Sequence, residues 1–125
     1  ETAGEFVVNI VDEALGKGMV KTAATHPPGT NKIEASGLSV KPSKILKTPR
    51  IAEAPVALEC RLVSVQVLED AQVDLVVGRV ESFYIRDELW KGGKVDPKAL
   101  HAIGGIGLTQ YITTRDIFII PNSDD

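Results

Sequence analysis

Two long runs of alternating apolar and polar residues dominate the chain, from Val56 to Leu68 and from Val73 to Arg86. A period of two is typical of a β-strand. In the first run the apolar residues occupy even positions up to Leu62 and odd positions from Val63 onward. Because this period cannot change parity without an inserted residue, the sequence predicts a β-bulge between Leu62 and Ser64. The two runs therefore predict a long, curved antiparallel hairpin of the kind that builds a small β-barrel.

The first part of the chain predicts one strand followed by one helix. Phe6–Val11 is short and rich in β-branched residues, which favours a strand buried on both faces. Glu13–Ala23 has apolar residues at helical spacing, and Asp12 is a suitable N-cap. Gly16 and Gly18 lower the helix propensity, so we expect tertiary packing to hold this helix in place.

Proline marks the loops and one further helix. Pro27 and Pro28 cannot lie inside a regular strand ladder, so they predict a loop. Asp96 is a suitable N-cap with Pro97 in the first helical position, which predicts a short C-terminal helix. Asp116–Pro121 is mostly apolar and predicts a closing strand.

Length and charge limit the classes of protein. The 125 residues suit a single domain, residues 1–125, with 43% hydrophobic and 25% charged residues. The net charge is −3 and the basic residues are scattered, which argues against nucleic-acid binding. No run approaches the roughly 20 apolar residues of a membrane helix. The single cysteine, Cys60, excludes an internal disulfide, and we expect a cytoplasmic location.

No residue pattern predicts a metal site or a catalytic side chain. His26 and His101 are isolated from other metal-ligand residues. Cys60 falls on the apolar parity of its strand, which favours a small buried hydrophobe over a nucleophile. Ile103–Gly107 is rich in glycine, but a predicted helix precedes it, so a turn is favoured over a dinucleotide-binding loop.

The remaining charged and aromatic positions predict surface contacts. Glu59 and Arg61 alternate with apolar residues on one strand, and Arg79 and Glu81 lie on the facing strand, so we expect cross-strand ion pairs. Trp90 favours a surface anchor or a dimer contact over stacking on a substrate.

Five segments, in order, resemble the flavin reductase-like FMN-binding split-barrel proteins, a family that includes flavoredoxins. The matching segments are Gly4–Val11, Pro27–Gly29, Ala35–Leu38, Pro49–Leu62 and Gly92–Pro97. Gly78–Glu81 and Arg86–Asp87 extend the likeness along the hairpin. The resemblance implies a mainly β fold with short helices, an antiparallel Greek-key split barrel. It also implies that the chain is the C-terminal portion of such a barrel, since the family's first strands and FMN-phosphate motif would precede Glu1.

The resemblance implies FMN as the cofactor and NAD(P)H as the co-substrate. Hydride would pass from NAD(P)H to FMN, and the cofactor would carry the chemistry. Asn9, at the end of the first matched strand, and Tyr111, after the glycine turn, are the residues expected to line the flavin pocket. The family also implies a homodimer.

Two other functions stay open beside this FMN-dependent oxidoreductase. One is a non-enzymatic, flavin-binding electron carrier, which would share the fold and FMN but would not oxidise NAD(P)H. The other is a cofactor-free barrel fragment that serves as an interaction module.

Overall fold

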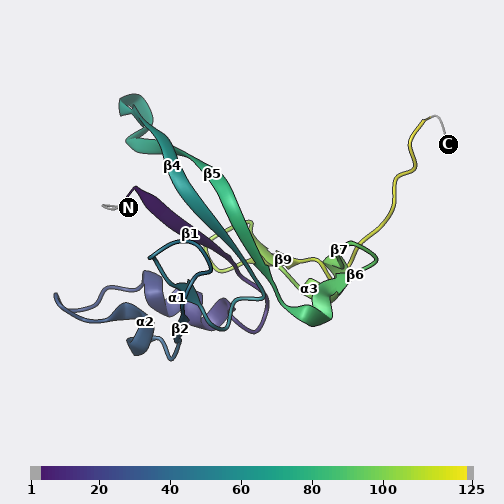
Figure 1. Cartoon of the computed structure of the whole chain (residues 1–125), viewed down its shortest axis with the longest axis horizontal. Helices are drawn as coiled ribbons and strands as arrows, with labels where there is room; N and C mark the ends of the chain where they lie inside the picture. The colour runs from purple at the N-terminus through teal and green to yellow at the C-terminus, as the bar shows by residue number, and fades with distance from the viewer. Residues whose placement is uncertain (1–3, 124–125) are drawn as a thin grey trace.

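A three-stranded antiparallel sheet forms the centre of the structure, a computed structural model that describes residues 4–123. Strand β4 (Val56–Leu68) lies between β1 (Glu5–Ile10) and β5 (Val73–Ile85). The predicted hairpin is therefore confirmed, and its tip projects beyond β1 (Figure 1).

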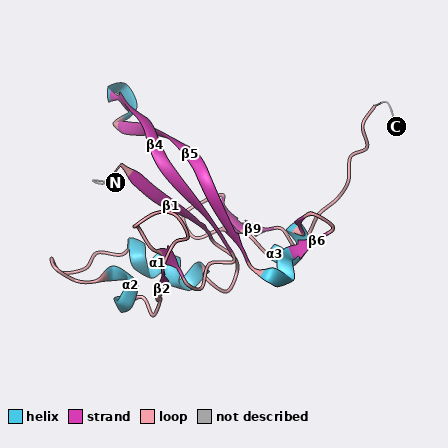
Figure 2. Ribbon diagram, viewed as in Figure 1, coloured by secondary structure: helices cyan, strands magenta, loops and turns pink. Residues whose placement is uncertain are grey.

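Short elements surround this sheet, with the helices α1 and α2 to one side and the β6–β9 region to the other (Figure 2). Before β4 the chain forms α1 (Gly16–Ala23), α2 (Lys32–Ala35), β2 (Val40–Lys41) and β3 (Arg50–Ile51). The hairpin turn contains η1 (Glu69–Ala71). After β5 come η2 (Asp87–Leu89), β6 (Trp90–Lys91), β7 (Lys94–Val95), α3 (Pro97–Leu100), β8 (Ile103–Gly105) and β9 (Tyr111–Thr113).

The hairpin contains two bulges, one on each strand. The predicted bulge is confirmed: Leu62 pairs with Gly78 and Ser64 with Val77, which leaves Val63 as the extra residue. A second register shift lies between Glu59 and Cys60, where Glu81 of β5 is the extra residue. Because the extra residues lie on opposite strands, the shift introduced at one bulge is cancelled at the other.

Gly78 gives the ring of Phe6 room against the hairpin. A Cβ atom on Gly78 would lie 2.5 Å from Cζ of Phe6 and 2.8 Å from its Cε1. Glycine is thus required because a neighbouring ring occupies the space of a side chain. The alternation of apolar residues in β5 is broken at Gly78, the position where the Phe6 ring approaches the backbone.

A buried carboxylate attaches the segment before β3 to the sheet. The Glu59 side chain is 2% exposed and accepts three backbone N–H bonds, from Lys44 (2.7 Å), Ile45 (2.8 Å) and Leu46 (3.2 Å). Burial alone would raise the pKa of Glu59, but the three donors outweigh it and lower that pKa. Glu59 therefore stays ionised and fixes residues 44–46 over the sheet.

Two polar side chains of β1 attach the same segment farther along. Glu5 accepts bonds from the backbone N–H and the hydroxyl of Thr48, both at 2.7 Å. The Asn9 Oδ1 atom accepts the backbone N–H of Ile51 at 2.9 Å. Glu5, Asn9 and Val7, the residue that pairs with Glu59, point to one face of β1. The segment before β4 covers this face.

The ion pairs predicted between β4 and β5 do not form; Arg61 instead pairs across to β1. Glu59 holds backbone N–H groups, as described above, and Arg61 lies 3.6 Å from Glu5. Arg79 pairs with Glu81 two residues along the same strand, at 2.9 Å. The parity pattern could not show that the face carrying Glu59 is covered by a distant segment rather than solvated.

The helix starts are partly as expected. Helix α1 begins at Gly16 rather than Glu13, because the Asp12 carboxylate instead accepts the N–H of Leu15 (2.9 Å) in a preceding turn. In α3 the prediction is confirmed: Asp96 accepts the N–H groups of Lys98 and Ala99, and Pro97 is the first helical residue.

Asp116–Pro121 is not a strand, contrary to the prediction. The segment runs away from the body of the protein (Figure 1) and pairs with no strand among residues 4–123. Phe118 and Ile119 are 80% and 86% exposed. Apolar composition indicated a strand, but a strand also needs a sheet edge within reach.

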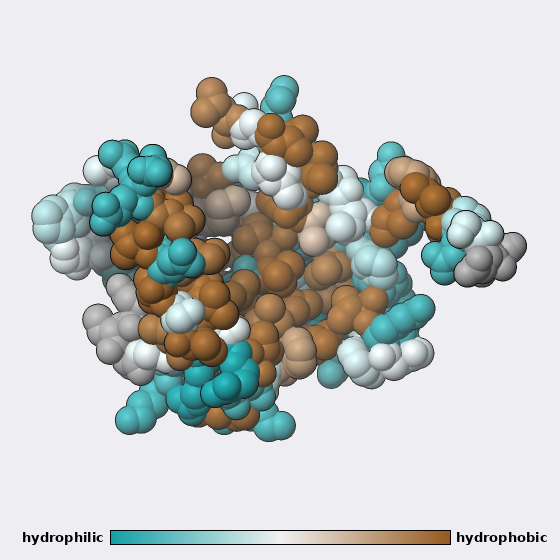
Figure 3. Space-filling view, turned by 90° about the horizontal axis from the view of Figure 1, so that it is seen from above, coloured by the Kyte–Doolittle hydropathy of each residue, from teal (hydrophilic) through white to brown (hydrophobic). Residues whose placement is uncertain are grey.

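Apolar side chains remain exposed on both faces of the hairpin tip. Figure 3 shows apolar residues spread over much of the face seen from above. The exposed tip residues are Val63, Val65, Val67, Leu68, Val73, Leu75, Val76 and Val77. No helix within residues 4–123 is long and apolar enough to cross a membrane.

Replacing the buried carboxylate should destabilise the fold. E59Q places an amide NH₂ against backbone donors, and we expect a loss of about 2–4 kcal/mol in the free energy of unfolding. Because the pKa of Glu59 is lowered on folding, its stabilisation is present above the ordinary value of 4.5 and is lost as the pH falls through the lowered value. Between neutral and acidic pH, the free energy of unfolding should therefore fall less in E59Q than in wild type, as measured by urea unfolding.

E69Q is the matched control, since Glu69 is exposed at the hairpin turn. It should leave both the stability and its pH dependence unchanged. If wild type and E59Q lost the same free energy of unfolding on acidification, the role given to Glu59 would be contradicted.

Substituting Gly78 should also be costly. G78A must displace the Phe6 ring or bend β5, and we expect about 1–3 kcal/mol of destabilisation. G104A is the control, because a Cβ atom there would meet Ile112 at an ordinary 3.4 Å. Thermal unfolding of both variants tests this: a loss in G104A as large as in G78A would show that the Phe6 contact is not the cause.

Candidate functional site

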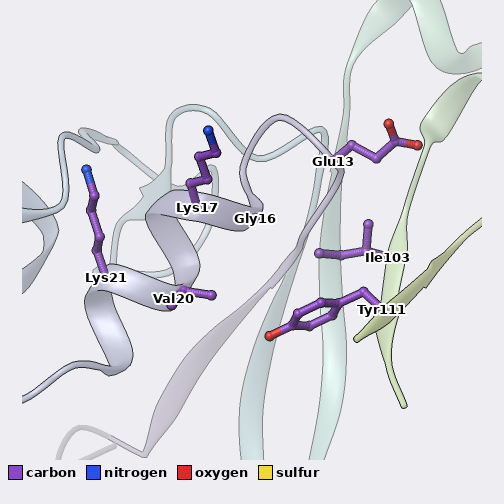
Figure 4. A pocket seen from close by; sticks show the side chains of 7 residues that line it. All are labelled: Glu13, Gly16, Lys17, Val20, Lys21, Ile103 and Tyr111. Atoms are coloured by element: carbon purple, nitrogen blue, oxygen red, sulfur yellow. The ribbon is translucent and has the colours of Figure 1, made fainter. Parts of the chain in front are cut away.

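An open cavity lies between α1 and the β8–β9 hairpin (Figure 4). Its volume is about 510 Å³. Its walls are formed by Glu13, Gly16, Lys17, Val20, Lys21, Ile103 and Tyr111. Apart from the charged groups at its rim, the lining is apolar, which is typical of a small-molecule site.

Backbone hydrogen bonds hold β8 next to the start of α1. The N–H of Ile103 donates to the carbonyl of Val11 (3.0 Å), and the N–H of Glu13 donates to the carbonyl of His101 (3.0 Å). Gly16 then approaches this hairpin closely, since a Cβ atom on it would lie 3.3 Å from Cδ1 of Ile103. The first turn of α1 and strand β8 thus lie side by side at the base of the cavity.

Tyr111 supplies the aromatic wall of the cavity. It opens β9, pairs with Gly105 of β8 and is 42% exposed. In Figure 4 its ring points toward Val20 of α1 across the cavity. A partly exposed ring beside apolar side chains suits the stacking of a planar ligand.

At the rim of the cavity, positive charge exceeds negative charge. Glu13 accepts hydrogen bonds from Arg115 Nε (2.7 Å) and Thr113 Oγ1 (2.6 Å). These bonds, that of Arg115 first, lower the pKa of Glu13, and the pKa of Arg115 is raised in turn. Lys17 and Lys21 form no ion pair within residues 4–123, so the rim carries a local excess of positive charge.

Asn9 and Tyr111, the two predicted flavin contacts, are not brought together. Tyr111 lines the large cavity, whereas Asn9 lines a separate one of about 270 Å³. That second cavity is bounded by Asn9, Val11, Leu15, Met19, Thr22, Ile33, Leu38 and Ile51. The Nδ2 atom of Asn9 is the donor that a ligand there could use, because its Oδ1 accepts the N–H of Ile51.

Lys17 and Lys21 also line the cavity, although no motif in the sequence marks them as candidates. Their spacing of four residues places them on one face of a helix, and Gly16 lies beside that face. This spacing was visible in the sequence, but the cavity was not, because its other wall comes from residues more than 80 positions away.

The chain offers little other reactive chemistry. Cys60 is 4% exposed, as predicted for a buried hydrophobe, and burial raises the pKa of its thiol. No group of His, Cys, Asp and Glu residues within 4–123 could hold a metal ion.

The family model of the flavin reductase like domain matches residues 1–99. The chain belongs to this family. The recognition made from the hairpin and its flanking motifs is therefore confirmed.

Solved structures of flavin-related proteins share the fold. Nitrilotriacetate monooxygenase component B from Bacillus cereus is 31% identical with a TM-score of 0.85, over 94% of this chain and 60% of that one. 2-Nitrobenzoate 2-nitroreductase from Pseudomonas fluorescens is 30% identical with a TM-score of 0.86, over 95% and 59%. A Shewanella frigidimarina protein with a split barrel domain is 22% identical with a TM-score of 0.86, over 96% and 61%. The mainly β split-barrel fold is thus confirmed.

This chain spans about half the length of the curated relatives that it matches. Two of them, from Halalkalibacterium halodurans and Deinococcus radiodurans, are 30% and 32% identical, and the match covers 54% and 52% of their lengths. Both are uncharacterised, so they add no activity to the family assignment.

Removing the Asn9 side chain tests its structural contact. N9A leaves the N–H of Ile51 without its acceptor, and we expect a loss of about 1–3 kcal/mol in the free energy of unfolding. Amide hydrogen exchange should show faster exchange at Ile51. N31A is the control, because Asn31 caps only the exposed helix α2. Unchanged exchange at Ile51 in N9A would show that this hydrogen bond does not hold the segment.

Proposed function

We propose that this chain forms part of an FMN-dependent oxidoreductase in which hydride passes from NAD(P)H to the flavin. The observation that carries this proposal is the open cavity against Tyr111 in a member of the flavin reductase like family. The activity belongs to the protein as a whole, since the chain spans only part of its relatives.

The residues present fit a flavin ring. The cavity volume lies within the range of small-molecule sites, and its interior combines aliphatic side chains with one aromatic ring. FMN, when bound, supplies the hydride-accepting chemistry. Tyr111 would then stack against the ring, while Val20 and Ile103 exclude water from its edge.

In this proposal the side chains bind and orient the ligands, and the cofactor supplies the chemistry. Hydride transfer to a flavin needs no protein nucleophile, which agrees with the inert, buried thiol of Cys60. We retain Asn9 as a second predicted flavin contact, through its Nδ2 atom. The predicted cytoplasmic location and homodimer also belong to this proposal, and the exposed apolar hairpin tip supports a homodimer.

An enzyme is favoured over an electron carrier by the two similar structures at or above 30% identity. One is a monooxygenase component and the other a nitroreductase, both named for redox enzymes. A carrier would bind FMN without oxidising NAD(P)H. A cofactor-free interaction module would bind no FMN at all, so two measurements separate the three functions.

Tyr111 provides the test of the site. Y111A should weaken FMN binding about 2- to 13-fold in a flavin-fluorescence titration of the full-length protein, because a stacked aromatic contact contributes about 0.5–1.5 kcal/mol. Y111F keeps the ring and should bind as wild type does. W90A is the control, as Trp90 lies on β6, outside the cavity lining.

The accompanying assay is NADH and NADPH oxidation with FMN present. Oxidation by wild type supports the enzyme, and FMN binding without oxidation would indicate the carrier. If Y111A retained wild-type FMN affinity, the ring site would have to lie elsewhere.

A further inference from the structure

We propose that Glu13 and Arg115 are positioning residues that, through Thr113, hold the Tyr111 ring in place for the flavin. This proposal deepens the proposed function and rests on it for the presence of a flavin. Neither charged side chain has to touch the ligand, because both act through β9, the strand that carries Tyr111.

Glu13, Thr113 and Arg115 are joined by a closed ring of hydrogen bonds, the Glu13 network. The Glu13 Oε2 atom accepts bonds from the Thr113 hydroxyl (2.6 Å) and from Arg115 Nε (2.7 Å). The same Thr113 oxygen accepts the backbone N–H of Arg115 (3.3 Å). Because the three bonds polarise one another, the loss of one member weakens the remaining bonds.

The Glu13 network attaches the end of β9 to the turn before α1. Strands β8 and β9 form a sheet of their own, separate from the central sheet. Backbone bonds at Val11 and Glu13 fix β8, whereas the Glu13 carboxylate reaches Thr113 of β9, 100 residues away in the sequence. In addition to its pairing with β8, β9 is thus held against the turn before α1 by side chains.

Strand geometry passes this restraint on to the aromatic ring. Side chains two residues apart on a strand point to the same face, so Tyr111 shares the face of Thr113. In Figure 4 the Tyr111 ring points toward Val20, and the Glu13 carboxylate points away from that ring. A displacement of Thr113 would therefore move the ring, although Glu13 itself lies at the rim of the cavity.

The opposite charges of Glu13 and Arg115 make a positioning role distinguishable from an electrostatic one. Through its charge alone, Glu13 would repel the FMN phosphate and Arg115 would attract it. Removing Glu13 would then strengthen FMN binding, and removing Arg115 would weaken it. A positioning role predicts that both removals weaken binding, because either one opens the Glu13 network.

The experiment measures FMN and riboflavin affinity of the full-length protein by flavin-fluorescence titration. E13A and R115A should each weaken FMN binding about 2- to 5-fold, the range expected for the loss of an exposed ion pair. Riboflavin has the ring without the phosphate and should lose affinity by the same factor. R115K keeps a charged donor opposite Glu13, so it should lose less affinity than R115A.

A second set of variants tests whether the effect passes through Tyr111. In the Y111A background, E13A and R115A should weaken FMN binding no further, because the ring that they position is already absent. Losses that instead added to that of Y111A would contradict the positioning of this ring.

The matched control is R79A. Arg79 Nε and Glu81 Oε2 form the same kind of ion pair at 2.9 Å on β5, and neither residue lines the cavity. R79A should bind FMN as wild type does. Circular dichroism and thermal unfolding establish that all variants are folded.

A measurement without ligand separates this proposal from the proposed function. Amide hydrogen exchange over residues 111–113 should be faster in E13A and R115A than in wild type. If wild type bound no FMN while this exchange rose in both variants, the proposed function would fail and the restraint on β9 would stand. Unchanged exchange, FMN affinities that move in opposite directions in E13A and R115A, or an equal loss in R79A would each overturn the proposal.

Discussion

The three hydrogen bonds to the Glu59 carboxylate are the constraint on which the rest of the structure depends. A buried charge is costly unless donors surround it, and here consecutive N–H groups of residues 44–46 meet that need. These groups can reach Glu59 only if residues 40–51 cross the sheet. The carboxylate thereby turns an irregular segment into the cover of one sheet face.

The cavity depends on a different kind of contact. Its two walls come from α1 and from the β8–β9 hairpin, which lie far apart in the sequence and are joined by backbone bonds at Val11 and Glu13. Gly16 lets them approach at the base, and Tyr111 closes the opposite side. Because the backbone sets this spacing, side chains on the walls can change ligand preference without disturbing the sheet.

The sequence predicted local features well and long-range contacts poorly. The bulge at Val63 and the start of α3 follow from parity and capping, which involve neighbouring residues only. The burial of Glu59 could not be predicted, because its partners lie 13 to 15 residues away in a segment without a regular pattern. For the same reason a motif could suggest Tyr111 as a candidate, while the cavity that it lines beside α1 could not be predicted.

The unpaired segment at 116–121 has a consequence for the behaviour of the chain in concentrated solution. Four consecutive apolar residues, Ile117–Ile120, are exposed and pair with no strand within residues 4–123, so they would form a template for intermolecular β-pairing. Asp116 precedes them and Pro121 follows, one a charge and the other a residue without an N–H donor. These two residues act as gatekeepers that limit the growth of such a pairing in both directions.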